Sequence, residues 1–142
     1  GASPGSTGGG IKTSTLFALI QGIKTAATNT SGKAFHYSVP HGVFRKASVI
    51  AVMGISVIAV GTFMLCAFEP DIAIRDALFE MTSAFGTVGL TTGITTGLCT
   101  ASKLTSIVMM YIGRLGPLTI ATLWYFTNGD RIKYPDGNIA IG

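Results

Sequence analysis

The feature that most constrains the fold is a long apolar run without a single charge. Residues 47–68 are 22 consecutive positions that lack Asp, Glu, Lys and Arg, and about 20 such residues cross a ~30 Å hydrocarbon core as a helix. Ten of them are Val, Ile, Leu or Phe, which together favour insertion by about 4–5 kcal/mol. The whole chain has only 11% charged residues, less than half of the ~25% usual in soluble domains. The run therefore predicts a transmembrane helix in an integral membrane protein.

A second apolar run has an arginine near its middle. Residues 104–127 include nine Val, Ile, Leu or Phe residues, which favour insertion by about 3–5 kcal/mol, whereas a central arginine costs about 2.5–3.5 kcal/mol. This span is stable only if Arg114 faces protein or water. Gly113, Gly116 and Pro117 beside it weaken the helix further. Arg114 is therefore a candidate functional residue.

The segment between the two runs is typical of a re-entrant pore loop. Residues 71–85 have helical spacing of apolar side chains, but fifteen residues reach only ~22 Å as a helix, too short to cross. Residues 86–93 follow with the sequence GTVGLTTG, which has little helix propensity. Non-helical backbone at membrane depth is tolerated only where protein buries it or where it lines a watery cavity. We expect a pore helix and a pore loop here; the alternative is an ordinary extracellular turn.

The backbone of this loop offers the oxygens that a dehydrated monovalent cation needs. Gly89 permits the backbone angles that turn carbonyl groups inward, where stacked carbonyls replace the ion's water shell. The preceding short helix ends here, so its negative dipole end faces the ion. The candidate ion-binding residues are Thr87, Val88, Gly89 and Leu90.

The distribution of charges predicts an orientation. Acidic residues flank the pore segment, whereas the bases before the first span have no acid among them: Lys12, Lys24, Lys33, Arg45 and Lys46. By the positive-inside rule, residues 24–46 and the tail at 128–142 are cytoplasmic and the loop enters from outside. The basic residues are not interleaved with aromatic ones on one patch, so the sequence does not indicate a nucleic-acid partner.

The amino-terminal segment is similar to a phosphate-binding loop but departs from it. The nucleotide-binding form needs Lys directly after the last Gly, and here Ile11 lies between Gly10 and Lys12. The chain has no nucleophile–base pair, and Cys66 and Cys99 lack the spacing of a metal site. We therefore expect no enzymatic activity, no catalytic residues and no cofactor in this chain.

Three motifs in order carry a resemblance to a known family. They are GASPGSTGGGIKTST at 1–15, SAFGTVGLT at 83–91 and MYIGRLGPLT at 110–119. Together they resemble the Trk/Ktr/HKT family of potassium transporters, in particular its bacterial Ktr/Trk membrane subunit. In that family, four helix–pore loop–helix repeats of one polypeptide surround a single pore. The resemblance implies that this chain is a C-terminal fragment, comprising the end of repeat three and all of repeat four.

The resemblance also implies an all-α membrane fold with a stated division of the chain. A helix–pore loop–helix repeat, similar to that of K⁺ channels, is preceded by the second half of an interrupted transmembrane helix. The expected parts are the gate loop and inner half-helix of repeat three at 1–28, a cytoplasmic loop at 29–46, repeat four at 47–127 and the tail at 128–142. Within repeat four we expect a transmembrane helix at 47–68, a pore helix at 71–85, the filter at 86–92 and a transmembrane helix at 104–127.

Roles for single residues follow from the same resemblance. Residues 87–90 would form one quarter of a selectivity filter, and Arg114 matches a pore-facing arginine close to the gate. The gate loop would consist of Gly5, Ser6, Thr7, Gly8, Gly9 and Gly10.

The implied setting is K⁺ uptake across a bacterial plasma membrane. K⁺ is the transported ion, and the chain is part of a multi-pass protein with a cytoplasmic C-terminus. The implied partners are the missing repeats of the same polypeptide, a second copy in a homodimer, a cytosolic nucleotide-binding ring of the RCK type and the lipid membrane. A different class of function, a non-conducting two-span anchoring or assembly module, remains the alternative.

Overall fold

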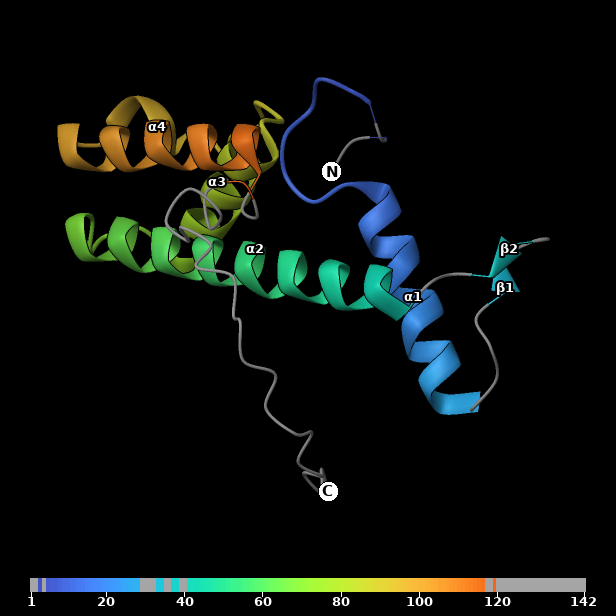
Figure 1. Ribbon diagram of the computed structural model, residues 1–142. Helices are drawn as coiled ribbons and strands as arrows, with labels where there is room; N and C mark the ends of the chain where they lie inside the picture. Colours follow the sequence, from blue (N-terminus) through green and yellow to red (C-terminus); the bar gives the residue numbers. More distant parts are fainter. Residues whose placement is uncertain are drawn as a thin grey trace, which may run out of the picture.

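The computed structural model of the chain describes residues 3, 5–28, 33–34, 37–38, 41–116 and 119. Within these residues the chain is helical apart from loops and one pair of two-residue strands (Figure 1). The strands pair antiparallel, with Lys33 opposite Ser38. The elements are α1 (Thr13–Thr28), β1 (Lys33–Ala34), β2 (Tyr37–Ser38), α2 (His41–Phe68), α3 (Ile74–Gly86), the 3₁₀ turn η1 (Ile94–Gly97) and α4 (Thr100–Leu115).

The long helix α2 is built to face an apolar environment. Its segment Val43–Phe68 is long and apolar enough to cross a membrane, and only 22% of its most apolar stretch is buried within the chain. Large side chains such as Phe63 (75% exposed) and Ile55 (65% exposed) project outward. A soluble protein would bury most of such a helix in its core, so these faces suit lipid or further transmembrane helices.

Helix α2 begins at His41, earlier than the expected start at residue 47, because its first turns pack on α1. The ring of Phe44 lies against Gly22, where a Cβ atom would come within 1.8 Å of a ring carbon. The absence of a side chain at Gly22 therefore lets α1 and α2 cross closely, as small residues do between membrane helices. This crossing places α1 across the first half of α2 (Figure 1).

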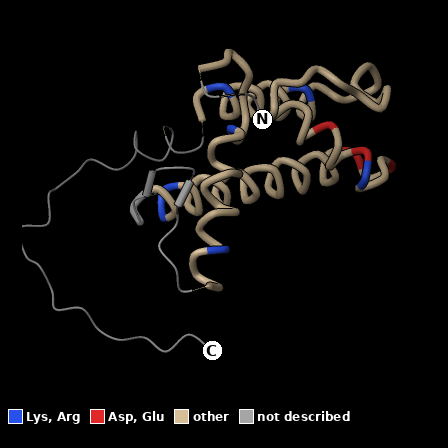
Figure 2. Tube along the Cα trace, turned by 90° about the vertical axis from the view of Figure 1, so that its right-hand side faces the viewer, with Lys and Arg blue, Asp and Glu red and all other residues tan. Residues whose placement is uncertain are grey.

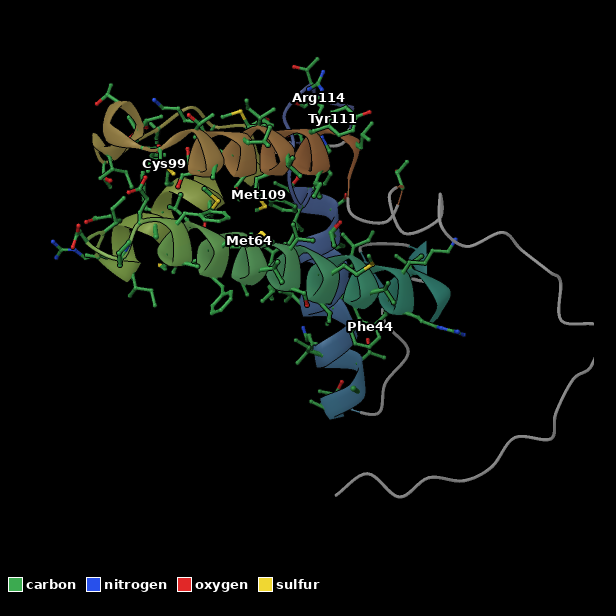
Figure 3. All side chains as sticks on the ribbon, turned by 90° about the vertical axis from the view of Figure 1, so that its left-hand side faces the viewer. Phe44, Met64, Cys99, Met109, Tyr111 and Arg114 are labelled. Atoms are coloured by element: carbon green, nitrogen blue, oxygen red, sulfur yellow. The ribbon has the colours of Figure 1, made fainter. Side chains whose placement is uncertain are left out.

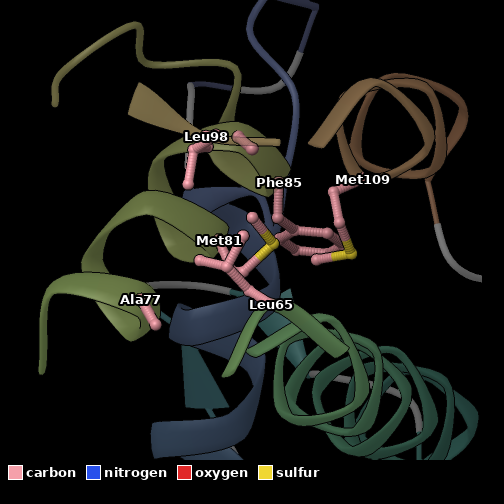
Figure 4. Packing of buried hydrophobic residues seen from close by; sticks show 7 residues of the cluster. Leu65, Ala77, Met81, Phe85, Leu98 and Met109 are labelled. Carbon is pink, nitrogen blue, oxygen red and sulfur yellow. The ribbon is translucent and has the colours of Figure 1, made fainter. Parts of the chain in front are cut away.

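The short helix α3 lies between α2 and α4 and supplies most of the core. Its 13 residues extend for about 20 Å, too short to span a bilayer. Side chains of α2, of α4 and of the segment before α4 meet those of α3 here (Figure 4). The buried members of this core are Leu65, Ala77, Met81, Ala84, Phe85, Leu98 and Met109.

Helix α4 packs on this core through a glycine. At Gly113, an added Cβ atom would lie 1.9 Å from the carbonyl oxygen of Phe85. Such an approach is possible only for a residue without a side chain, and it brings the backbones of α3 and α4 together. The end of α3 is therefore fixed against the last turn of α4.

The bounds of α4 differ from the expected span at 104–127. The helix begins at Thr100 because Cys99 caps it, and it ends at Leu115, before Gly116 at φ +86°. Arg114 consequently lies in the last turn of α4 rather than in the middle of a helix. Residues 117, 118 and 120–142, which include the rest of the expected span and the tail, lie outside the described residues.

A carboxylate ties the start of α4 to the end of α2. Glu69 Oε1 accepts a hydrogen bond from the Cys99 N–H at 2.6 Å and one from the Ser102 hydroxyl at 3.4 Å. The bond from the Cys99 amide, together with those from the Cys99 and Ser102 side chains, holds the pKa of Glu69 below its ordinary value. A negative charge at a helix N-terminus also interacts favourably with the helix dipole.

We predict that Gly113→Ala destabilises the fold by about 1–3 kcal/mol, because the methyl group would overlap backbone that cannot move aside easily. The matched control is Gly61→Ala, where the nearest atoms to the new Cβ belong to the side chain of Met109 rather than to backbone. Thermal unfolding of the full-length protein in detergent measures both. A Gly113→Ala protein as stable as the Gly61→Ala protein would contradict the close packing of α3 and α4.

We also predict that the Glu69 contact weakens in acid. Because the folded state lowers the pKa of Glu69, its stabilisation is complete above the unfolded pKa of about 4.3 and is lost as the pH falls through the lower folded value. The difference in melting temperature between the parent protein and Glu69→Gln should therefore shrink below about pH 4. A difference that stays constant across this range would show that the carboxylate charge is not involved.

Candidate functional site

The site is built around the C-terminal end of α3, where the chain turns sharply out of the helix. The amide of Thr87 donates to the Ala84 carbonyl and the amide of Val88 to the Ser83 carbonyl, both at 3.0 Å. Thr87 itself adopts a left-handed conformation at φ +51°. A β-branched residue rarely takes this conformation without support from its surroundings. The turn therefore depends on contacts that the Thr87 side chain makes elsewhere.

Those contacts come from the amino-terminal segment. The Gly9 amide donates a hydrogen bond to Thr87 Oγ1 at 2.8 Å, and the Gly10 amide donates to the Gly113 carbonyl at 3.0 Å. Gly9 and Gly10 are buried, and a Cβ atom on Gly9 would lie 2.8 Å from Thr87 Cγ2. The structure thus brings together the end of the expected gate loop, the first expected filter residue and the last turn of α4.

After the turn, the chain runs back along α3. Gly89 has φ +81°, and the Leu90 amide donates to the Ser83 hydroxyl at 3.0 Å. Within the described part of the chain, no hydrogen bond uses the carbonyl oxygens of residues 87–90. Backbone carbonyls are strong acceptors that normally find partners. In the described part of the chain, these four oxygens therefore have no protein donor.

A cavity of about 470 Å³ lies beside this backbone. Three of the four expected filter residues line it, namely Thr87, Gly89 and Leu90, whereas the Val88 side chain is 57% exposed and lies outside its lining. Ser83 and Thr91 add hydroxyl groups. Within the described residues, no three His, Cys, Asp or Glu side chains are arranged to hold a metal ion.

The remaining expected gate residues lie further from the loop. Gly5, Ser6 and Thr7 are exposed, and the Ser6 hydroxyl accepts a bond from the Gly8 amide at 3.2 Å. The side chain of Lys12 folds back onto the expected gate loop. Its Nζ donates hydrogen bonds to the Ser6 carbonyl at 3.2 Å and to the Gly8 carbonyl at 2.5 Å. From the sequence, Lys12 was considered as a topological charge and as the lysine of a phosphate-binding loop, but not as a donor to the gate loop. Its position four residues after Gly8 was the signal for a local bond.

The side chain of Arg114 is exposed and points away from α2 and α3 (Figure 3). No ion pair or hydrogen bond links it to the gate segment within the described residues; the ion pair found there joins Arg75 and Asp76 at 3.7 Å. Its neighbour Gly113 makes the gate contact instead, through its carbonyl. A role for Arg114 in gating stays a prediction.

Charges are separated along the molecule. Figure 2 shows the described acidic residues gathered toward one end of α2, and basic residues at its other end and on α1. In the sequence, Glu69 and Asp71 directly follow α2, with Arg75 soon after them, whereas Arg45 and Lys46 lie in the first turns of α2 and Lys24 lies on α1. Such a separation is typical of a helix that crosses a membrane with its basic end inside.

Comparison with known proteins gives a family and several relatives. The sequence profile of TrkH, described as a cation transport protein, matches residues 1–132. Ktr system potassium uptake protein B of Bacillus subtilis is 36% identical over 143 residues, and the protein of the same name from Vibrio alginolyticus is 35% identical over 143. Potassium/sodium uptake protein NtpJ of Enterococcus hirae is 36% identical over 149 residues. Each alignment covers 100% of this chain but only 32%, 31% and 33% of the respective relative, so the chain spans about a third of their length.

We predict that Ser83→Ala frees the loop backbone, because the Leu90 amide loses its acceptor. One hydrogen bond contributes about 0.5–1.5 kcal/mol, so hydrogen exchange of the Leu90 amide should rise roughly two- to tenfold. Thr82→Ala on the same helix is the control, since its hydroxyl bonds only the Leu78 carbonyl. Equal exchange in the two variants would mean that Ser83 does not hold the loop.

Proposed function

The chain belongs to the TrkH family of cation transport proteins, and on that premise we propose that it is a pore-lining part of a potassium uptake protein. In this proposal, residues 87–90 form one of four loops that make a selectivity filter. K⁺ passes through it down its electrochemical gradient. The chain contributes no catalytic chemistry of its own.

The observation that carries the proposal is that the carbonyl oxygens of residues 87–90, beside a cavity, accept no hydrogen bond from the described residues. An ion that leaves water needs several oxygens at once, and backbone carbonyls can supply them without a charged side chain. The left-handed Thr87 and the positive φ of Gly89 keep these carbonyls out of helical hydrogen bonding. The carboxyl end of α3 adds a partial negative charge at the same place.

A single loop does not form a pore, so the proposal requires further repeats outside this chain. The chain spans about a third of the length of its relatives, which leaves room for the other repeats in the rest of the polypeptide. Selectivity belongs to the complete ring of loops. The names of the relatives include potassium uptake and potassium/sodium uptake, and we propose K⁺ as the principal ion here.

The amino-terminal segment is proposed as the gate below this filter. The Gly9 amide bonds to the Thr87 hydroxyl, so a movement of the amino-terminal segment would change the position of Thr87, the first proposed ion-binding residue. Lys12 gives the segment a defined shape, and glycines give it freedom to change that shape. Arg114, on the turn of α4 that holds Gly10, would place a positive charge near the passing ion.

The setting of the complete protein follows from the same proposal. Residues 1–28 would close repeat three, residues 47–127 would form repeat four, and the loop at 29–46 and the tail at 128–142 would be cytoplasmic. The separation of charges along α2 supports this orientation in a bacterial plasma membrane. A homodimer controlled by a cytosolic nucleotide-binding ring completes the proposal.

The proposal predicts that Gly89→Val in the full-length protein lowers K⁺ uptake at least about tenfold in a transport-deficient host. A Cβ atom at Gly89 meets nothing within 4 Å, but its φ of +81° is strained for valine. The substitution therefore acts on the direction of the carbonyls rather than on packing. Uptake and the amount of protein in the membrane are measured together.

The control is Gly97→Val at the last residue of η1, where a Cβ would also meet open space. It should leave uptake within about twofold of the parent, as expected of surface changes. Normal uptake by Gly89→Val at a normal membrane level would contradict a filter at residues 87–90. It would favour the non-conducting anchoring module instead.

A further inference from the structure

A buried carboxyl group on α3 is not explained by an ion pair. Glu80 is only 6% exposed, and within the described residues no Lys or Arg side chain forms an ion pair with it. Its Oε2 atom has no hydrogen-bond partner there. Burying a carboxyl group is costly unless it is well bonded. The hydrogen bonds of its other oxygen, Oε1, therefore indicate what the carboxyl group does at this position.

Oε1 of Glu80 ends a chain of hydrogen bonds that comes from the loop after the filter. The Thr95 hydroxyl donates to Glu80 Oε1, and the Thr91 and Thr95 hydroxyl oxygens are 2.7 Å apart. The Gly93 amide donates to Thr91 Oγ1 at 3.0 Å. A hydroxyl has a single proton, so Thr95, which gives its proton to Glu80, must accept from Thr91. Every donor in the chain then points toward the carboxyl group, an arrangement in which each bond strengthens the next.

These hydrogen bonds add to the contacts between α3 and the proposed filter. Ser83 lies three residues after Glu80, hence on the same face of the helix, and it accepts the Leu90 amide. Glu80 and Ser83 line the same cavity as Leu90, Thr91 and Thr95. One face of α3 thus makes two contacts with the loop. Ser83 binds the amide of Leu90, the last of the proposed filter residues, and Glu80 binds Thr95 in the segment that follows.

We infer that Glu80 is a positioning residue for ion selection: through Thr95 it fixes residues 91–95 and so sets the direction of the neighbouring Leu90 carbonyl. The inference rests on the proposed function, because it assigns a way of controlling the same filter. What the position requires is a hydrogen-bond acceptor at the end of the chain. A glutamine supplies one through its amide oxygen, and a leucine does not.

The test compares variants of the full-length protein in K⁺ and Na⁺ uptake. Glu80→Leu and Thr95→Val each break the chain, and each should raise the KM for K⁺ or lower the K⁺/Na⁺ uptake ratio about three- to tenfold, as expected for one lost hydrogen bond. Glu80→Gln and Thr95→Ser keep the chain and should return both values toward those of the parent. In the double variant Glu80→Leu/Thr95→Val, the KM and the ion ratio should change no more than in the more impaired single variant, since both substitutions remove the same contact.

Thr82→Val is the matched control on α3, because its exposed hydroxyl bonds only the Leu78 carbonyl. Membrane abundance and maximal rate are measured for every variant, so that folding defects are separated from changes in KM and ion ratio. If Glu80→Leu does not reach the membrane, Thr95→Val decides the matter, because it leaves the buried position untouched.

Two results would overturn the inference. One is a Thr95→Val protein with the KM and ion ratio of the parent; the other is a Glu80→Gln protein as impaired as Glu80→Leu, which would make the charge the requirement. Failure of the proposed function is distinguishable, since it appears as normal uptake by Gly89→Val. Loss of uptake in Gly89→Val together with an unaffected Thr95→Val would leave the filter in place and remove only the role of Glu80.

Discussion

The hydrogen bond from the Gly9 amide to the Thr87 hydroxyl is the contact on which the arrangement of the site depends. It supports a threonine in a left-handed conformation at the end of α3, which is an unfavourable conformation for a β-branched residue. Because Thr87 turns there, the following carbonyls leave the helix and stay without partners in the described part of the chain. The same segment reaches α4 through Gly10 and Gly113. Three segments far apart in sequence are thereby joined at one point.

Close backbone packing makes this junction possible. The Phe85 carbonyl lies where a side chain on Gly113 would be, and Phe44 lies where one on Gly22 would be. Between membrane helices, where burial of apolar surface gives little driving force, such close approaches supply much of the stability. The outward apolar side chains of α2 are then left for lipid or for other parts of the complete protein. Close packing behind the loop, and carbonyl oxygens in front of it that have no protein donor in the described part of the chain, suit the proposed exchange of an ion's water for protein oxygens.

The sequence predicted the features that depend on composition and short-range pattern. The uncharged run at 47–68 is strong enough to predict α2, and the short apolar segment before GTVGLTTG predicts a helix close to α3. The family resemblance is confirmed by the match of the TrkH profile. The early start of α2 was not predictable, because it depends on Phe44 meeting Gly22 from another helix. The glycines and the proline beside Arg114 indicated a weak helix there, but the end of α4 at Leu115 depends on the backbone conformation of Gly116, which hydropathy does not register.

The contacts of the site could not be predicted from the sequence, because they join residues far apart in it. Thr87 and Gly9 are 78 positions apart, and no local pattern indicates that one will support the other. No local pattern singles out Glu80, whereas the fold buries it and gives it a hydrogen bond from Thr95. Only tertiary packing shows that its partner is a loop residue fifteen positions later.

The central claim is that the carbonyl oxygens of residues 87–90 replace water around a permeating K⁺ ion. The most direct measurement is an experimental structure of the full-length protein in a K⁺ salt, repeated with a heavier monovalent cation such as Tl⁺ that can be located by its scattering. The account predicts cation density on the pore axis within coordination distance of these oxygens, with Thr87 still bonded to Gly9. Carbonyls that point away from the axis or bond to protein amides, with no cation beside them, would contradict it.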